Sequence, residues 1–136
     1  MPEELRAGLT ATRELVIDRE RTIDFMGDEA RVYATPALVR DIEMAARDLL
    51  LAHLPEGQDS VGTRVELDHI AATLLGMSVT LVLTVTEVEG RRVMFSIEGR
   101  DSVEPICRGR HQRFVVDVAS TARRLAAKAA KAGLSA

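Results

Sequence analysis

Hydrophobic and polar residues alternate with a period of two along several segments, which is the pattern of a β-strand with one buried face. In residues 78–88, every second position from Val79 to Val85 is an apolar Val or Leu, and the positions between them are mostly Thr. After Glu89-Gly90-Arg91 the alternation resumes over residues 93–98. These two runs are therefore predicted to pair as an antiparallel hairpin.

Three further segments predict strands around this hairpin. Residues 61–71 alternate strictly, which places His69 on the predicted buried face. Residues 106–116 predict a last strand, and residues 12–17 predict a first strand whose extension to residue 23 stays open. Residues 27–31 are expected to form a loop.

Residues 36–54 carry helical spacing instead, with apolar side chains recurring in one broad arc. Thr35 and Pro36 give this helix a start signal, because Thr can accept a hydrogen bond from the orphan amides and Pro lacks the amide hydrogen that would go unpaired there. Pro55 and Gly57 end the helix. A long, buried central helix is predicted.

An alanine-rich helix is expected at the C-terminal end, with a cap at Asp117 or Ser120 and an end at Gly133. The element order is thus a strand, a long helix, four strands with short connections and a last helix. Such segregation favours an antiparallel sheet packed on one helix over a parallel fold. The sequence predicts an α+β fold in which residues 1–136 form a single domain.

The composition narrows the class of protein. The chain has 136 residues, 46% of them hydrophobic, and one cysteine, Cys107, so it can bury a core but cannot form an intrachain disulfide or a cysteine metal cluster. The histidines match no zinc-binding spacing, and no metal is expected. The first ten residues lack the apolar stretch of a signal peptide, and no apolar run approaches the roughly 20 residues of a membrane helix. We expect a cytoplasmic protein without membrane contact.

The net charge of −3 argues against general affinity for nucleic acid. The distribution is uneven, because seven arginines and lysines lie from Arg108 onward, against one acid, Asp117. A solvated helix face and strand edge are the common explanation of such a run. RNA binding is the alternative, but Phe114 is the one aromatic residue in this segment, and base stacking uses aromatic side chains. No nucleic-acid partner is expected.

Glu43 projects from the margin of the apolar arc of the predicted helix, where a carboxylate is unfavourable. An exposed ion pair with Arg40 or Arg47, three and four residues away, is the simpler explanation. The alternative is a carboxylate in a partly desolvated cleft, where its basicity rises. The spacing of these residues does not decide between the ion pair and the partly desolvated carboxylate.

His69 and Thr35 are the other candidates for chemistry. An imidazole exchanges protons near neutral pH, and His69 points to the face that meets the helix, although most buried histidines are structural. Thr35 has a structural task as a helix cap, and the same place also suits an oxyanion, since backbone amides and a positive helix end lie beside it. His53, near the helix end, and His111, on the last strand, are weaker candidates.

Together, short motifs between residues 33 and 116 resemble hotdog-fold thioesterases, and among them the group of fluoroacetyl-CoA thioesterases. The motifs are Tyr33-Ala34-Thr35, Glu43, Val61-Gly62-Thr63, His69-Ile70-Ala71-Ala72-Thr73, Gly76-Met77-Ser78-Val79-Thr80, Glu89-Gly90-Arg91-Arg92 and Gly109-Arg110-His111. The resemblance implies a hotdog fold, in which an antiparallel sheet wraps a long central helix. It also implies a homodimer with active sites at the subunit interface.

The resemblance further implies the roles of site residues. A Thr at the helix start, a Glu in the helix and a His on the next strand form the catalytic set of the family, and these map onto Thr35, Glu43 and His69. Gly62 is expected beside the thioester, where its amide can donate to the carbonyl. The implied activity is hydrolysis of a small acyl-CoA thioester, with coenzyme A as part of the substrate and no separate cofactor.

The resemblance has a limit upstream of Tyr33. Members selective for fluoroacetyl-CoA carry aromatic lid residues there, whereas this chain has Phe25-Met26-Gly27 and no matching aromatic pair, so fluoroacetyl specificity is not expected. A non-catalytic module that binds acyl-CoA or another small ligand is the alternative, and enoyl-CoA hydration is a weaker one. Arg123 and Arg124 are candidate ligands of the coenzyme A phosphates, because guanidinium groups pair with phosphate oxygens.

Overall fold

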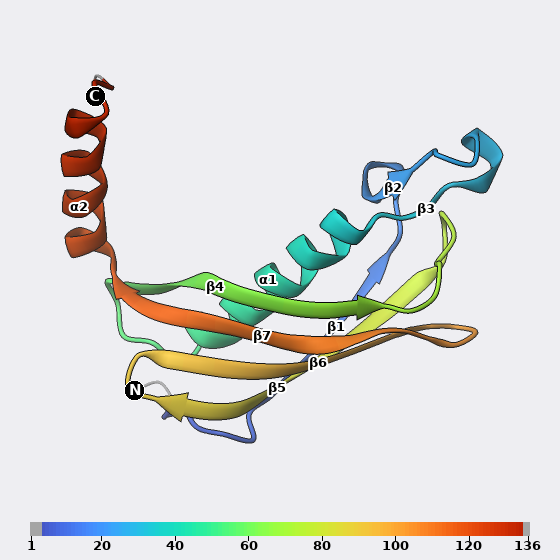
Figure 1. Cartoon of the computed structure of the whole chain (residues 1–136). Coiled ribbons are helices and arrows are strands. Elements are labelled where there is room, and N and C mark those ends of the chain that lie inside the picture. The colour runs from blue at the N-terminus through green and yellow to red at the C-terminus, as the bar shows by residue number, and fades with distance from the viewer. Residues whose placement is uncertain (1–3, 135–136) are drawn as a thin grey trace.

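The computed structural model describes residues 4–134, in which five antiparallel strands form one sheet beside a long helix, α1 (Thr35–Leu51) (Figure 1). The strands are β1 (Thr10–Val16), β4 (Gln58–His69), β5 (Ser78–Glu89), β6 (Arg92–Asp101) and β7 (Pro105–Asp117), in the spatial order β1-β5-β6-β7-β4. Short strands β2 (Thr22–Ile23) and β3 (Val32–Tyr33) pair with each other beyond the sheet. The predicted α+β architecture is confirmed.

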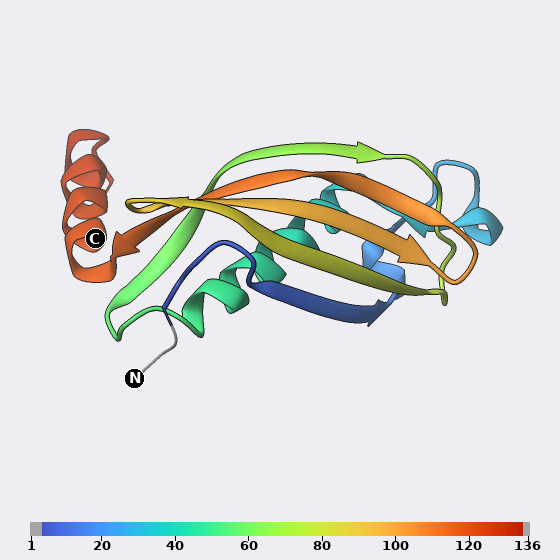
Figure 2. The same ribbon diagram turned by 90° about the horizontal axis from the view of Figure 1, so that it is seen from below.

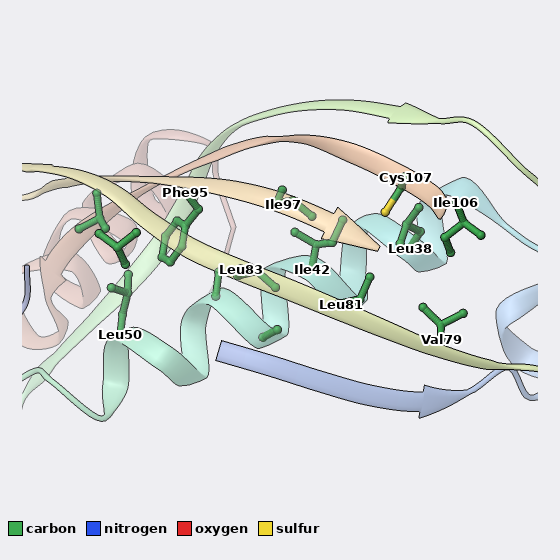
Figure 3. Packing of buried hydrophobic residues seen from close by; sticks show 14 of the residues in the cluster. Leu38, Ile42, Leu50, Val79, Leu81, Leu83, Phe95, Ile97, Ile106 and Cys107 are labelled. Atoms are coloured by element: carbon green, nitrogen blue, oxygen red, sulfur yellow. The ribbon is translucent and has the colours of Figure 1, made fainter. Parts of the chain in front are cut away.

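The sheet curves around α1, so that the inner faces of the two elements form the core (Figures 2 and 3). The alternating apolar residues of β5 and β6 line this core, among them Leu81, Leu83 and Phe95, which are fully buried. From the helix, Leu38, Ile42 and Leu50 pack against them. Burial of each such side chain contributes about 1.5–3 kcal/mol. The core therefore fixes α1 along the strands, and with it every side chain that α1 carries.

Two turns follow their sequence signals. Gly90 has a φ of 60° between β5 and β6, which are antiparallel as predicted. Asp117, rather than Ser120, caps helix α2 (Val118–Lys131), because its side chain accepts a hydrogen bond of 3.0 Å from the Ser120 amide. The helix leads into Gly133, whose φ of 75° suits glycine.

The first strand does not extend to residue 23. β1 ends at Val16, and Asp18 then caps a 3-10 turn (Arg19–Arg21) by accepting a hydrogen bond of 3.1 Å from the Arg21 amide. This turn redirects the chain into β2, while a second 3-10 turn (Asp28–Ala30) lies in the predicted loop. At the other end of the prediction, α1 stops at Leu51 rather than near residue 54.

β4 contains a bulge that strict alternation does not predict. Its pairing with β7 shifts between Gly62 and Arg64, so Thr63 is the extra residue. The bulge puts Val61 on the outer face, where it is 45% exposed, while Gly62 and Val65 both face inward. β4 is also the edge of the described sheet, and Val65 is 37% exposed, whereas Leu67 and Ala71 pack against the core. The predicted burial of this face is therefore wrong for Val61 and Val65 and correct for its last part.

Cys107 lies on the inner face of β7, buried in the core. Its sulfur packs over Gly99, where an added Cβ would lie 2.6 Å from Sγ. Burial raises the pKa of the Cys107 thiol to about 11. Within residues 4–134, no helix has both the length and the apolar character needed to cross a membrane.

Candidate active site

Thr35 and His69 meet where α1 begins and β4 ends. Thr35 is the first residue of α1, and Ala34 occupies the cap position, so the predicted capping role of Thr35 is wrong. The Thr35 hydroxyl instead lies 2.8 Å from Nδ1 of His69. The helix start and the end of the edge strand are thereby joined through two side chains that can exchange protons.

The imidazole of His69 is half-buried and has one unused nitrogen. Tyr33 lies edge-on to the ring, with the centroids 6.2 Å apart. Nε2 is covered, and no residue among 4–134 hydrogen-bonds to it. Burial lowers the pKa of His69, so the ring is neutral at pH 7. Such a nitrogen is suited to taking up or delivering a proton.

An open cavity of about 300 Å³ borders this pair. Its lining is mostly apolar, and consists of Ile23, Val32, Tyr33, Thr35, His69, Ile70, Ala71 and Ala72. Pockets with apolar walls and a few placed polar groups are typical of sites for small organic ligands. This cavity has the size and lining for a short acyl group.

Glu43 lies on the same helix but faces β7. Its Oε2 is 3.3 Å from Nη1 of Arg113, whereas Arg47 binds Asp59 at 2.7 Å. The prediction of an exposed ion pair between Glu43 and Arg40 or Arg47 is therefore wrong. The alternative prediction, a partly covered carboxylate, describes the structure. The Glu43 side chain is 41% exposed, while its partner Arg113 is 4% exposed.

Arg113 is held by a network of hydrogen bonds. Its Nε donates to Oγ of Ser60 at 2.7 Å, and its Nη2 donates to the Ser60 carbonyl at 2.8 Å. Nη1 also lies 3.3 Å from Nε2 of His111, whose Nδ1 is 2.9 Å from the Arg64 carbonyl. Burial lowers the pKa of Arg113 and that of His111, which leaves His111 neutral and able to accept from Arg113.

Arg113 and His111 thus surround Glu43, although the sequence pattern does not single them out. His111 is only a weak candidate by its position, and Arg113 is one of several bases in the C-terminal segment. Their positions in the sequence do indicate a role. The two residues are two positions apart on the inward face of a predicted strand, where a charged side chain needs a buried partner. That partner is Glu43 for Arg113.

Gly62 completes the surroundings of Glu43. A Cβ at this position would clash with Oε2 of Glu43 and lie 3.2 Å from Cε1 of His111. The close approach of the main chain, rather than an unusual backbone angle, requires glycine here.

Within one chain, the predicted site residues fall into two groups. Thr35 with His69 forms the first and Glu43 with Gly62 the second. Thr35 and Glu43 are eight residues apart, about 12 Å along the helix axis at 1.5 Å per residue. Arg123 and Arg124 belong to neither group, since they lie on α2 and donate to Ser120 and Thr121 of the same helix. In residues 4–134, no cluster of three or more His, Cys, Asp or Glu side chains is placed to hold a metal.

Comparison with known proteins finds similar sequences and similar structures. Residues 17–119 match the family model described as fluoroacetyl-CoA-specific thioesterase. The chain is similar to the fluoroacetyl-CoA thioesterase of Streptantibioticus cattleyicolor, with 30% identity over 123 residues, 85% of this chain and 88% of the relative.

Solved structures are similar as well. The fluoroacetyl-CoA thioesterase FlK superposes with a TM-score of 0.84 at 28% identity, covering 93% of this chain and 98% of FlK. FlK variants have been solved in complex with acetyl-CoA and with fluoroacetate and CoA. A hot-dog-like protein from Thermanaerovibrio acidaminovorans superposes with a TM-score of 0.82 at 29% identity, covering 90% of this chain and 91% of that protein.

Proposed function

Because the chain belongs to the fluoroacetyl-CoA-specific thioesterase family and is a thioester hydrolase of the hotdog fold, we propose that it hydrolyses a small acyl-CoA with Thr35, Glu43 and His69 as catalytic residues. The observation that carries this proposal is the hydrogen bond between Thr35 and His69 at the border of an apolar cavity of about 300 Å³. Neither a binding module nor a structural domain requires an imidazole with an unpaired buried nitrogen beside a hydroxyl.

The complete site is formed by two copies of the chain. β4 is an edge strand that carries Gly62 near its start and His69 at its end. Antiparallel pairing of β4 with its copy, about a twofold axis near Val65, brings Gly62 and Glu43 of one chain towards His69 and Thr35 of the other. The same pairing satisfies the open hydrogen-bonding edge of β4, which an isolated domain leaves exposed.

In this composite site the thioester carbonyl lies between the two groups. The Thr35 hydroxyl and the Gly62 amide donate to the carbonyl oxygen and stabilise the charge that develops on it. His69 donates from Nδ1 to Thr35, which directs the hydroxyl hydrogen at the substrate and leaves Nε2 as an acceptor.

Glu43, oriented by Arg113, opens the reaction by one of two routes. It takes a proton from a water molecule whose oxygen bonds to the acyl carbon, or its own oxygen bonds to that carbon. In the first route the C–S bond then breaks and gives the acid directly. In the second, the C–S bond breaks to leave an anhydride on Glu43, which a water molecule hydrolyses to the acid and free Glu43. In both routes the proton lost by water ends on the coenzyme A sulfur. The products are a carboxylic acid and a free thiol.

Thiol release from a panel of short acyl-CoA esters tests the proposal. Glu43→Gln and His69→Ala should each lower kcat/KM by about 10²–10⁴-fold, the usual contribution of a positioned acid or base. Glu56→Gln and His53→Ala are the matched controls, with circular dichroism to verify folding. Unchanged rates in both site variants would overturn the assignment, and ester binding without turnover by the wild type would favour a non-catalytic module.

Hydrolysis in ¹⁸O-labelled water separates the two routes. If Glu43 acts as a base, the label enters the acid product and never the protein. If Glu43 attacks the thioester, an anhydride forms, and attack of water on its glutamyl carbonyl places ¹⁸O in the Glu43 carboxylate. ¹⁸O in the peptide that contains Glu43, detected by mass spectrometry after many turnovers, establishes the covalent route. An unlabelled Glu43 results from the base route or from attack of water on the acyl carbonyl of the anhydride.

A further inference from the structure

Helix α2 stands away from the rest of its own chain. None of the residues that the structure describes in α2 is buried, and the helix extends from the end of β7 past the open edge of β4 (Figures 1 and 2). At 100° per residue, Val118, Ala122, Leu125 and Ala129 fall in one apolar stripe. Val118 and Leu125 are 49% and 61% exposed. Helices of this length owe most of their stability to packing of such a stripe.

We propose that α2 packs on the loop around Phe25 and Met26 of a second copy of the chain, and so caps the cavity of its partner. This inference rests on the homodimer of the proposed function. α2 begins beside the start of β4, because the Val118 amide donates to the carbonyl of Gly57, directly before β4, at 2.9 Å.

Strand pairing then determines what α2 meets. With a twofold axis near Val65, the start of one β4 at residue 58 lies opposite about residue 72 of the other chain, because the two offsets from the axis are equal. The segment that follows β4 is bonded to β3: Tyr33 donates its amide to the Thr73 carbonyl at 2.8 Å, and Val32 bridges to Leu74. The 25–26 loop lies between β2 and β3 and is thus at the same end of the dimer as α2 of the partner.

The two surfaces are complementary in polarity and charge. Phe25, Met26 and Leu74 are 81%, 60% and 54% exposed, which offers the apolar stripe of α2 an apolar counterpart. Residues 18–31 carry five acids and three bases, whereas α2 carries four bases and no acid. Opposite net charges favour association of these two segments over association of either with itself.

The arrangement has a function for the site. The cavity beside Thr35 and His69 is open, and Ile23 and Ile70 form part of its wall. A helix from the partner laid on the adjoining loop closes this opening, so each subunit supplies the cap of the site of the other.

A disulfide cross-link between two different chains tests the contact. A chain with Leu125→Cys is co-expressed with a differently tagged chain with Met26→Cys, while the native Cys107 is buried and does not compete. We expect a covalent heterodimer under mild oxidation. Ala127→Cys, on the opposite face of α2, is the matched control and should react at least about tenfold more slowly with Met26→Cys, because disulfides require close Cβ atoms.

Sedimentation of the same samples before oxidation measures the oligomeric state, and so tests the dimer separately from the α2 contact. A dimer whose Leu125→Cys chain cross-links no faster than the Ala127→Cys control would overturn the α2 contact and leave the β4 dimer intact. A monomer at micromolar concentration would overturn both. Faster cross-linking by Leu125→Cys in a dimer supports the contact.

Discussion

The main chain of Gly62 lies so close to the carboxylate of Glu43 that one added methyl group would clash with Oε2. The main obstacle to a larger residue is thus the far end of the Glu43 side chain, which is 41% exposed and can move. The second obstacle, Cε1 of the buried His111 at 3.2 Å, needs to shift by only a few tenths of an ångström. Gly62 therefore determines where the Glu43 carboxylate can lie and contributes little to the stability of the fold.

We therefore expect Gly62→Ala to separate activity from stability. The methyl group displaces the Glu43 carboxylate by about 1 Å or more, and misplacement of that size costs roughly 10²-fold in rate. The free energy of unfolding should change by less than about 1 kcal/mol, since the displaced side chain turns towards solvent. Steady-state kinetics and urea denaturation of the same sample measure both, and a normal kcat/KM would contradict this reading of the glycine.

Arg113 is expected to position Glu43 without contacting substrate. Arg113→Gln leaves Ser60 and Glu43 with unpaired groups, so it should lower both kcat and the free energy of unfolding, the latter by about 1–3 kcal/mol. Arg113→Lys keeps the charge but not the forked geometry. It should recover part of kcat, and a purely structural role would give equal kcat for the two variants once both are folded.

The acid limb of the pH profile should report on His69. Burial lowers the pKa of this imidazole from its ordinary 6.5, and Nε2 accepts a proton only when neutral. We expect kcat/KM to be level from pH 7 to 8 and to fall as the pH drops through the lowered pKa. The residual activity of His69→Ala should lack this limb, and an unchanged profile in that variant would assign the limb to another group.

Stability should also fall in acid. The pKa values of His69 and His111 are both lowered by burial, so the unfolded chain takes up protons at a higher pH than the folded chain. The free energy of unfolding is then constant above about pH 7 and decreases as the pH falls below 6.5, towards the folded pKa values. Urea titrations between pH 5 and 8 check the sign, and His111→Gln should flatten part of the slope.

Asp41 joins α1 to the β2–β3 hairpin. Its carboxylate accepts hydrogen bonds from Tyr33 and from Arg21, whose Nε and Nη2 lie 2.9 and 3.1 Å away. Asp41→Asn removes the charge that these donors share and should cost about 1–3 kcal/mol of stability. Thermal unfolding measures the loss. Asp48→Asn, which affects a more exposed ion pair with Arg13, should cost less than about 1 kcal/mol.

The paired arginines of α2 provide a test of coenzyme A recognition. If Arg123 and Arg124 contact its phosphates, changing both to Gln raises KM for acyl-CoA with little change in kcat, the signature of lost uniform binding. An acyl-N-acetylcysteamine ester, which has no nucleotide, should be hydrolysed equally by both proteins. Equal loss on both substrates would instead show that the arginines act through structure, and no loss on either would leave them as solvated side chains.

Much of the fold follows from local pattern. The hairpin of β5 and β6 is predictable because apolar residues alternate from Val79 to Val85, before the pairing shifts between Val85 and Glu87, and Gly90 supplies the turn. The helix α1 is predictable because its apolar arc is broad. The bulge at Thr63 is not, since an inserted residue leaves no trace in a polar edge strand, and strict alternation there assigns Val61 to the wrong face.

The site is harder to predict, because its parts come from distant elements. The family resemblance placed Glu43, His69 and Thr35, but spacing could not show that Thr35 bonds to His69 rather than capping the helix. Nor could it pair Glu43 with Arg113, seventy residues away. Helical neighbours are visible in a sequence, whereas a partner across the sheet depends on the register of β7.

The buried state of Cys107 has a practical consequence for a protein that handles thioesters. With a thiol pKa of about 11, roughly one molecule in a thousand carries a thiolate at pH 8. Acyl transfer from substrate to the protein needs that thiolate, so it does not compete with hydrolysis. A colorimetric count of free thiols in a reaction with native protein therefore measures product alone.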